Sequence, residues 1–166
     1  RRKRTALGGV GVDIVQADDL RATWARMSAA LGDGMTPAVV QRYIEQGVDV
    51  AVRVRRDADG SATVEVGLGG PASVFDPWEL GVLPLALPDA STLVSTSSVG
   101  RALTDPLDRV PVVALVHRLA ALVDDVDEIQ EVVANPVVVS GPEAWITDVD
   151  VVVGPPHREL PVRRLD

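Results

Sequence analysis

The sequence predicts an α+β domain, a mostly antiparallel sheet with helices packed on one face. Valines alternate with polar residues on both sides of a turn within residues 48–68, which is typical of a hairpin with one buried face. Apolar residues recur at helical spacing over residues 112–123 and predict a long amphipathic helix. Two more valine-rich segments, 130–139 and 144–153, predict a second hairpin.

The first third of the chain predicts a strand, a helix and another strand. Residues 6–14 are rich in glycine and β-branched residues, which indicates a glycine-containing strand. Asp18 and Asp19 are suitable N-caps for a helix whose apolar residues follow at helical spacing. The glycines in residues 32–34 would end this helix, and residues 39–44 indicate a short strand.

The middle of the chain combines clear turn signals with a less regular segment. The turn of the first hairpin falls at residues 57–60, and its second strand ends in Gly67-Leu68-Gly69-Gly70-Pro71. Pro88-Asp89 can open a short helix, although the Ser/Thr run at residues 95–98 weakens that prediction. Asp108 is the expected N-cap of the long helix.

Length and composition bound the class of protein. The 166 residues suffice for one domain with its own core and leave little room for a second. We expect this domain to span residues 1–153. Residues 154–166 contain three prolines and three arginines and are expected to form a flexible tail.

Charge and residue usage exclude several kinds of function. The formal net charge of −8 argues against nucleic acid or an anionic membrane as a partner. Because cysteine is absent, disulfides, thiolate metal sites and a cysteine nucleophile are excluded. No apolar run approaches the roughly 18 residues of a membrane span, and residues 1–4 are not followed by the apolar segment of a signal peptide. We therefore expect a soluble, cytoplasmic protein.

The predicted second hairpin brings polar side chains together. With its turn centred between Gly141 and Pro142, Asn135 lies directly opposite Asp148, and residue 133 lies opposite Asp150. Amide and carboxylate oxygens on one face would suit a hard cation such as Mg²⁺. Asn135, Asp148 and Asp150 are therefore candidate metal ligands. The alternative is that Asn135 only precedes a bend at Pro136 and that both aspartates are solvated.

The glycine cluster is a second candidate site. Gly67, Gly69 and Gly70 would let the backbone approach a phosphate closely, although a bend or bulge is the more common reason for such a cluster. The two histidines do not make a convincing catalytic group. His117 falls on the long helix and His157 in the tail, so a Ser-His-Asp triad or a multi-histidine metal site has little support.

Five motifs follow one another along residues 5–153 in an order that resembles a known family. They are Thr5-Ala6-Leu7-Gly8-Gly9-Val10, Gly47-Val48-Asp49-Val50 with Arg56-Asp57, Gly67-Leu68-Gly69-Gly70, Glu131-Val132-Val133-Ala134-Asn135-Pro136, and Ile146-Thr147-Asp148. Together they resemble the C-terminal ATP-grasp lobe of ADP-forming acetyl-CoA (acyl-CoA) synthetases, relatives of the succinyl-CoA synthetase β subunit. Each motif alone is modest, and their common order makes the resemblance fairly specific.

This resemblance implies a reaction, cofactors and partners. Such enzymes interconvert a carboxylic acid, CoA and ATP with acyl-CoA, ADP and phosphate through a phosphohistidine. The lobe would close over ATP or ADP, with Asp49 and the glycines of Gly67-Leu68-Gly69-Gly70 near the nucleotide. Mg²⁺ would bridge the phosphates to Asn135 and Asp148. The partners implied are the first ATP-grasp lobe and the CoA-binding domain of the same protein, and the lobe alone would not be catalytic.

Departures from the family pattern support an alternative. Val133 replaces an acidic residue, Val74 stands near the place of another, and Arg4 and Ala6 replace a lysine and an aspartate. Asp150, predicted to face Val133, would restore the lost charge from the opposite strand. These departures leave the enzymatic role open and favour, as the alternative, a degenerate regulatory domain that has lost its nucleotide and metal.

The tail gives this alternative a possible target. Residues 160–165 resemble the C-termini of actinobacterial proteins that fuse such a module to a GNAT lysine acyltransferase. The regulatory domain would then control the fused acyltransferase. A third alternative is a small interaction domain that binds no ligand.

Overall fold

The computed structural model describes residues 8–35 and 38–156. It divides the chain into two compact units, Arg1–Glu45 and Gln46–Asp166. The expected tail falls largely outside the described residues. Among the helices that the structure describes, none is long and apolar enough to cross a membrane.

The first unit contains the predicted helix. Helix α2 spans Ala17–Leu31 and continues into a 3₁₀ helix, η1, at Gly32–Met35. Gln16 is the N-cap, and the Asp19 carboxylate accepts a hydrogen bond from the Gln16 backbone N–H at 3.0 Å. The prediction of Asp18 or Asp19 as the N-cap is therefore wrong, because both lie in the first turn of the helix, where Asp19 stabilises the helix start through the Gln16 backbone.

The two strands predicted in this unit do not form in its described residues, so both predictions are wrong there. Residues 8–14 and 39–44 are irregular, and no described residue before Val48 belongs to a strand. In the first segment Gly8 has φ +75° and Asp13 has φ +57°, backbone values that interrupt an extended strand. In the second, Val39 and Val40 are each 78% exposed, so their β propensity is not supported by burial against a neighbouring strand.

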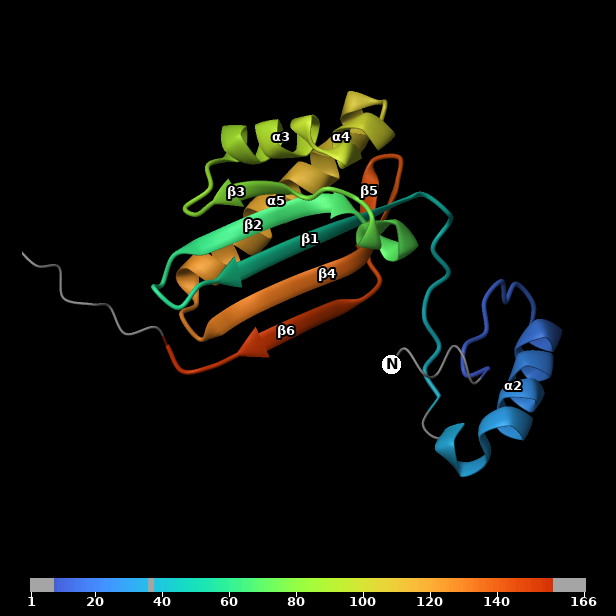
Figure 1. Cartoon of the computed structure of the whole chain (residues 1–166). Helices are drawn as coiled ribbons and strands as arrows, with labels where there is room; N and C mark the ends of the chain where they lie inside the picture. Colours follow the sequence, from blue (N-terminus) through green and yellow to red (C-terminus); the bar gives the residue numbers. More distant parts are fainter. Residues whose placement is uncertain (1–7, 36–37, 157–166) are drawn as a thin grey trace, which may run out of the picture. The chain divides into compact units, whose positions relative to one another are not determined.

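The second unit is built on a six-stranded antiparallel sheet (Figure 1). The strands are β1 Val48–Arg56, β2 Ala62–Leu68, β3 Glu79–Val82, β4 Ile129–Ser140, β5 Glu143–Ile146 and β6 Val149–Val153. Their order is β3-β2-β1-β4, after which β5 pairs with the second half of β4 and β6 with its first half. The predicted hairpins are both present, whereas β3 was not anticipated.

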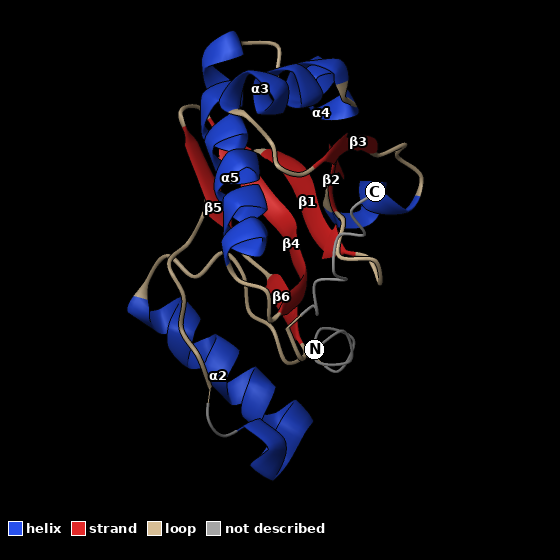
Figure 2. Ribbon diagram, turned by 90° about the vertical axis from the view of Figure 1, so that its left-hand side faces the viewer, coloured by secondary structure: helices blue, strands red, loops and turns tan. Residues whose placement is uncertain are grey.

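Helices cover one face of this sheet (Figure 2). They are α3 Leu87–Thr96, α4 Ser98–Ala102 and α5 Pro106–Asp125. Valines on alternate positions of β1 and β2 point toward them and are fully buried with Val112 and Val116 of α5. The predicted α+β architecture is therefore confirmed. The N-cap of α5 is Asp105, whose Oδ1 accepts from the Leu107 N–H at 2.9 Å, and not the expected Asp108.

The register of the last hairpin is the predicted one. Val137 pairs with Ile146, and Val133 pairs with Asp150. Between these pairs the Asn135 N–H donates to the Asp148 carbonyl oxygen at 3.1 Å. Pro136 coincides with an irregularity on the side of β4 that pairs with β1. There the register shifts between Val50 and Val52. This bulge accommodates a proline without loss of register in the hairpin.

Candidate functional site

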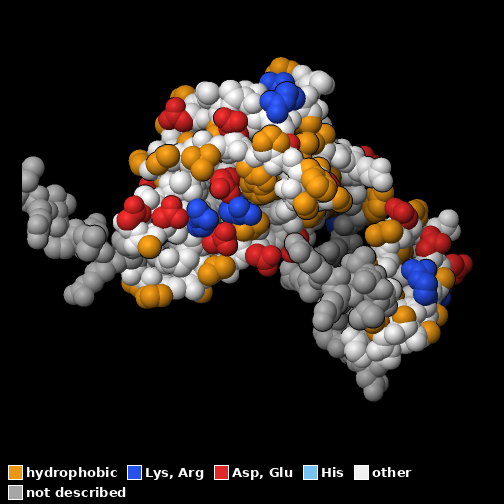
Figure 3. Space-filling model, viewed as in Figure 1, with side chains coloured by type: hydrophobic (Ala, Val, Ile, Leu, Met, Phe, Trp, Pro, Cys, Tyr) orange, Lys and Arg blue, Asp and Glu red, His pale blue; other side chains and the backbone are white. Residues whose placement is uncertain are grey.

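The face of the sheet opposite the α-helices carries polar side chains and is the candidate binding surface. Figure 3, seen from the side of this open face, shows basic side chains between acidic ones, with hydrophobic side chains gathered beside them. The alternation that buries Val50, Val52 and Val54 against the helices places Asp49 and Arg53 on the open face.

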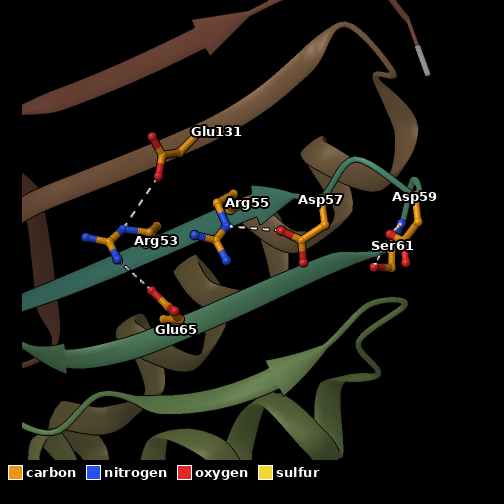
Figure 4. A network of polar contacts seen from close by, with 7 residues as sticks. All are labelled: Arg53, Arg55, Asp57, Asp59, Ser61, Glu65 and Glu131. Carbon is orange, nitrogen blue, oxygen red and sulfur yellow. Dashed lines mark hydrogen bonds and ion pairs between the residues drawn. The ribbon is translucent and has the colours of Figure 1, made fainter.

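Arg53 is the centre of a cross-strand network on the open face (Figure 4). Its Nη1 lies 2.8 Å from Glu65 Oε2 on β2, and its Nε lies 3.6 Å from Glu131 Oε1 on β4. The guanidinium carbon is 4.8 Å from the centroid of the Trp78 ring. Because the Arg53 side chain is 36% exposed, these ion pairs add little stability and mainly fix the position of its charge.

The predicted glycine cluster forms a tight corner against β1. The Gly69 N–H donates to the Asp49 carbonyl oxygen at 2.7 Å, and a Cβ on Gly69 would lie 2.6 Å from the Val50 carbonyl oxygen. Gly70 has φ +57°, and a Cβ there would lie 2.5 Å from Asp49 Oδ2. Gly69 therefore has no room for a side chain against the β1 backbone, and the positive φ of Gly70 favours glycine at that position. The corner therefore holds the Asp49 carboxylate directly beside the Gly70 backbone.

Asn135 connects this corner to the last hairpin. Its side-chain oxygen Oδ1 accepts a hydrogen bond from the Gly70 N–H at 2.8 Å, and its Nδ2 lies 3.5 Å from Ser73 Oγ. Asn135, one of the predicted metal ligands, thus contacts Gly70 of the predicted glycine cluster. The structure brings Asn135, Gly69, Gly70 and Asp49 together at the start of β1 on the open face, and we call this group the Asn135 corner.

Asp76 is a residue of this region that sequence reasoning missed. Its Oδ2 accepts from the Leu68 N–H at 2.8 Å and from the Ser98 hydroxyl. The same oxygen would lie 2.9 Å from a Cβ on Gly67, and the Trp78 ring packs over that glycine. Asp76 therefore ties the glycine cluster to α4. A single aspartate in a segment without periodicity gave no signal of this role.

Comparison with known proteins identifies the family to which this fold belongs. The sequence model of the ATP-grasp domain matches residues 2–153. The chain belongs to the ATP-grasp domain family. A search of curated proteins by sequence finds no match.

Solved structures with a similar fold agree with this family. Dinucleotide-forming acetyl-coenzyme A synthetase 1 of Ca. Korarchaeum cryptofilum, in complex with coenzyme A and Mg-AMPPCP, is 23% identical with a TM-score of 0.77, over 91% of this chain and 70% of that one. PH1788 from Pyrococcus horikoshii is 20% identical with a TM-score of 0.69, over 92% of this chain and 70% of that one. The resemblance to the ATP-grasp region of ADP-forming acetyl-CoA synthetases is therefore confirmed at the level of fold.

In this ATP-grasp domain, the predicted metal ligands differ in their surroundings. Asp148 is partly buried and its backbone is bonded to Asn135, whereas Asp150 is exposed and lies opposite Val133. Within residues 8–35 and 38–156, no three His, Asp or Glu side chains are placed to hold a metal ion. A cation would need the amide oxygen of Asn135, which has a second lone pair beyond the one used by Gly70. This donor set fits Mg²⁺, which commonly takes few protein oxygens and completes its shell with water and phosphate.

Proposed function

We propose that this ATP-grasp domain is the Mg-nucleotide-binding lobe of an ADP-forming acyl-CoA synthetase module. The module would convert a carboxylic acid, CoA and ATP into acyl-CoA, ADP and phosphate. The observation that carries the proposal is the Asn135 corner, where a glycine backbone, a carboxylate and an amide oxygen meet on the open face of the sheet. Nucleotide phosphates with a divalent cation are the ligands that this combination suits best.

Each residue of the corner would have its own part in binding. Gly69 and Gly70 would shape the corner in which a phosphate binds, because Gly69 has no room for a side chain against the β1 backbone and Gly70 has φ +57°. Asn135 fixes Gly70 through its hydrogen bond and would present its remaining lone pair to Mg²⁺, with Asp148 on the paired strand. When bound, Mg²⁺ would offset the negative charge of the phosphates. Asp150 would add negative charge opposite Val133.

Catalysis would need the rest of the protein. Reacting groups must be held in contact, and an open sheet face leaves one side of a bound nucleotide uncovered. We therefore propose the first ATP-grasp lobe and the CoA-binding domain of the same protein as partners. The solved complex of the Korarchaeum enzyme contains coenzyme A, Mg-AMPPCP and a phosphohistidine segment pointing towards the nucleotide binding site, which supports this assignment.

One observation favours a second candidate function. The Asn135 side-chain oxygen already accepts the Gly70 N–H, so the corner holds its shape through contacts within the chain. A domain of this kind could retain its fold after losing nucleotide binding. The second candidate is therefore a regulatory domain that controls a fused lysine acyltransferase.

Calorimetry on the full-length protein separates these two functions. The first function predicts binding of Mg-ATP and Mg-ADP, and we expect Gly70→Ala to weaken it about 10-fold or more, roughly 1.4 kcal/mol, because the new Cβ meets Asp49. Gly141→Ala is the matched control, since Gly141 has a similar φ of +56° in open space at the hairpin turn. Binding of acetyl-CoA without any binding of nucleotide would overturn the first function and favour regulation.

A further inference from the structure

Strand β6 forms an exposed apolar edge of the sheet. In the described part of the chain it pairs only with β4. Its four valines are exposed to different extents, Val149 by 43%, Val151 by 50%, Val152 by 50% and Val153 by 69%. Exposed sheet edges with apolar side chains are templates for pairing with another strand, and proteins usually protect them with charges or prolines. Asp150 is the only charged residue within β6.

The backbone of β6 offers a regular row of hydrogen-bonding groups. The Asn135 N–H bonds to the Asp148 carbonyl oxygen, and Val133 lies opposite Asp150. In an antiparallel strand, successive residues direct their backbone N–H and C=O groups alternately toward the partner strand and away from it. The backbone groups of residues 148, 150 and 152 therefore point toward β4. Those of Val149, Val151 and Val153 therefore point away from the sheet. The Gly154 N–H, which donates to the Glu128 carbonyl oxygen, continues this alternation.

We infer that β6 pairs antiparallel with β6 of a second copy of this chain, about a two-fold axis at Val151. In this register Val151 faces its own equivalent, and Val149 faces Val153 of the second copy. All the outward backbone groups of both strands then find partners. Asp150 faces Val152 of the second copy, so no like charges are opposed. The strand is thus complementary to itself in hydrogen bonding and in charge.

Neighbouring registers are less favourable for clear reasons. A slip of two residues in one direction places Asp150 opposite Asp150 of the second copy, where the two carboxylates repel. A slip in the other direction places Val149 opposite Pro155, which has no N–H to donate. Slips of one residue would match outward groups with groups that already bond to β4. The register centred on Val151 is therefore the one that the edge selects.

The association should be weak, because five-residue strands bury less than the roughly 1,200 Å² of stable interfaces. Sedimentation equilibrium of the 166-residue chain should show a monomer–dimer equilibrium with a dissociation constant on the order of 10–100 μM. Val151→Lys, which opposes two ammonium groups at the axis, and Val151→Pro, which removes an outward N–H, should each weaken it about 10-fold or more. Val151 is half-exposed on an edge strand, opposite the buried Val132, and unchanged circular dichroism would verify the fold of both variants.

Two further variants make this test specific to β6. Val152→Lys would place an ammonium opposite Asp150 in both halves of the pair, and we expect the dimer to tighten about 2- to 10-fold at low salt. Val82→Lys on β3, the other exposed edge, is the matched control and should leave the equilibrium unchanged. A chain that stays monomeric at all concentrations, or a dimer equally sensitive to Val82→Lys and Val151→Lys, would overturn the inference.

Discussion

At the scale of single residues, Asn135 joins two parts of the chain that are 65 positions apart. Its side chain accepts from Gly70 and its backbone pairs with Asp148, so the geometry of the Asn135 corner depends on it. An alanine in its place would leave the partly buried Gly70 N–H without its acceptor. An aspartate would retain an acceptor oxygen at the same place and add a negative charge.

We therefore expect Asn135→Ala to lower the free energy of unfolding by about 1–3 kcal/mol and Asn135→Asp to lower it by less. Urea denaturation measures this difference. For Mg-ATP, Asn135→Ala should abolish measurable binding, while Asn135→Asp should keep it, because a carboxylate oxygen also binds Mg²⁺. Equal stability of the two variants would show that the contact with Gly70 is not needed to hold the corner.

Asp76 and Ser98 form a second link at this scale, between the glycine cluster and α4. Asp76→Ala removes the acceptor of the Leu68 N–H and of the Ser98 hydroxyl, and should cost about 1–3 kcal/mol of stability. A double-mutant cycle with Ser98→Ala should give a coupling energy of about 0.5–3 kcal/mol. The exposed pair Asp59 and Ser61 is the control, where the same cycle should give a coupling near zero.

At the scale of elements, the beginning of α5 gives a direct comparison between two aspartates. Asp105 accepts a hydrogen bond from the Leu107 N–H, whereas Asp108 lies in the first turn and acts only on the helix dipole. Asp105→Ala should lower the free energy of unfolding by about 1 kcal/mol. Asp108→Ala should lower it by less, and thermal denaturation of both variants would verify the order. The opposite order would support the N-cap expected from the sequence.

Elements with strong periodicity were predictable from the sequence, and those that depend on distant partners were not. The two hairpins and α5 follow from alternating valines and a helical apolar stripe, and the turn centred at Gly141 sets the register that pairs Val133 with Asp150. Strand β3 escaped notice, because it has only four residues and its apolar residues Leu80 and Val82 are the exposed ones. The prediction for residues 39–44 was wrong in the opposite sense. Their β-branched residues suggested a strand, and no strand forms there.

The candidate site was predictable only in pieces. The sequence indicated the glycine cluster and the pairing of Asn135 with Asp148 as separate features. Their contact through Gly70 depends on the order of β2, β1 and β4 in the sheet, which the hairpins alone do not determine. Asp76 and Trp78 belong to a loop, where neighbours are set by tertiary packing.

At the scale of the whole molecule, the second unit has two faces with different roles. Valines of β1, β2 and β4 pack against α3 and α5 and supply the core. The opposite face presents Arg53 with its two glutamates and, at one end, the Asn135 corner. This separation lets the open face bind a ligand without any change in the core.

The proposed function requires that Mg-nucleotide binds on the open face, at the Asn135 corner. Two-dimensional ¹⁵N–¹H NMR spectra of the 166-residue chain, titrated with Mg-ATP, test it most directly. We predict saturable shifts for the backbone amides of Gly67, Gly69, Gly70 and Asn135 and for the Asn135 side-chain amide, with the amides of α5 unchanged. Spectra that stay unchanged at millimolar Mg-ATP, or shifts confined to α3 and α5, would contradict the claim.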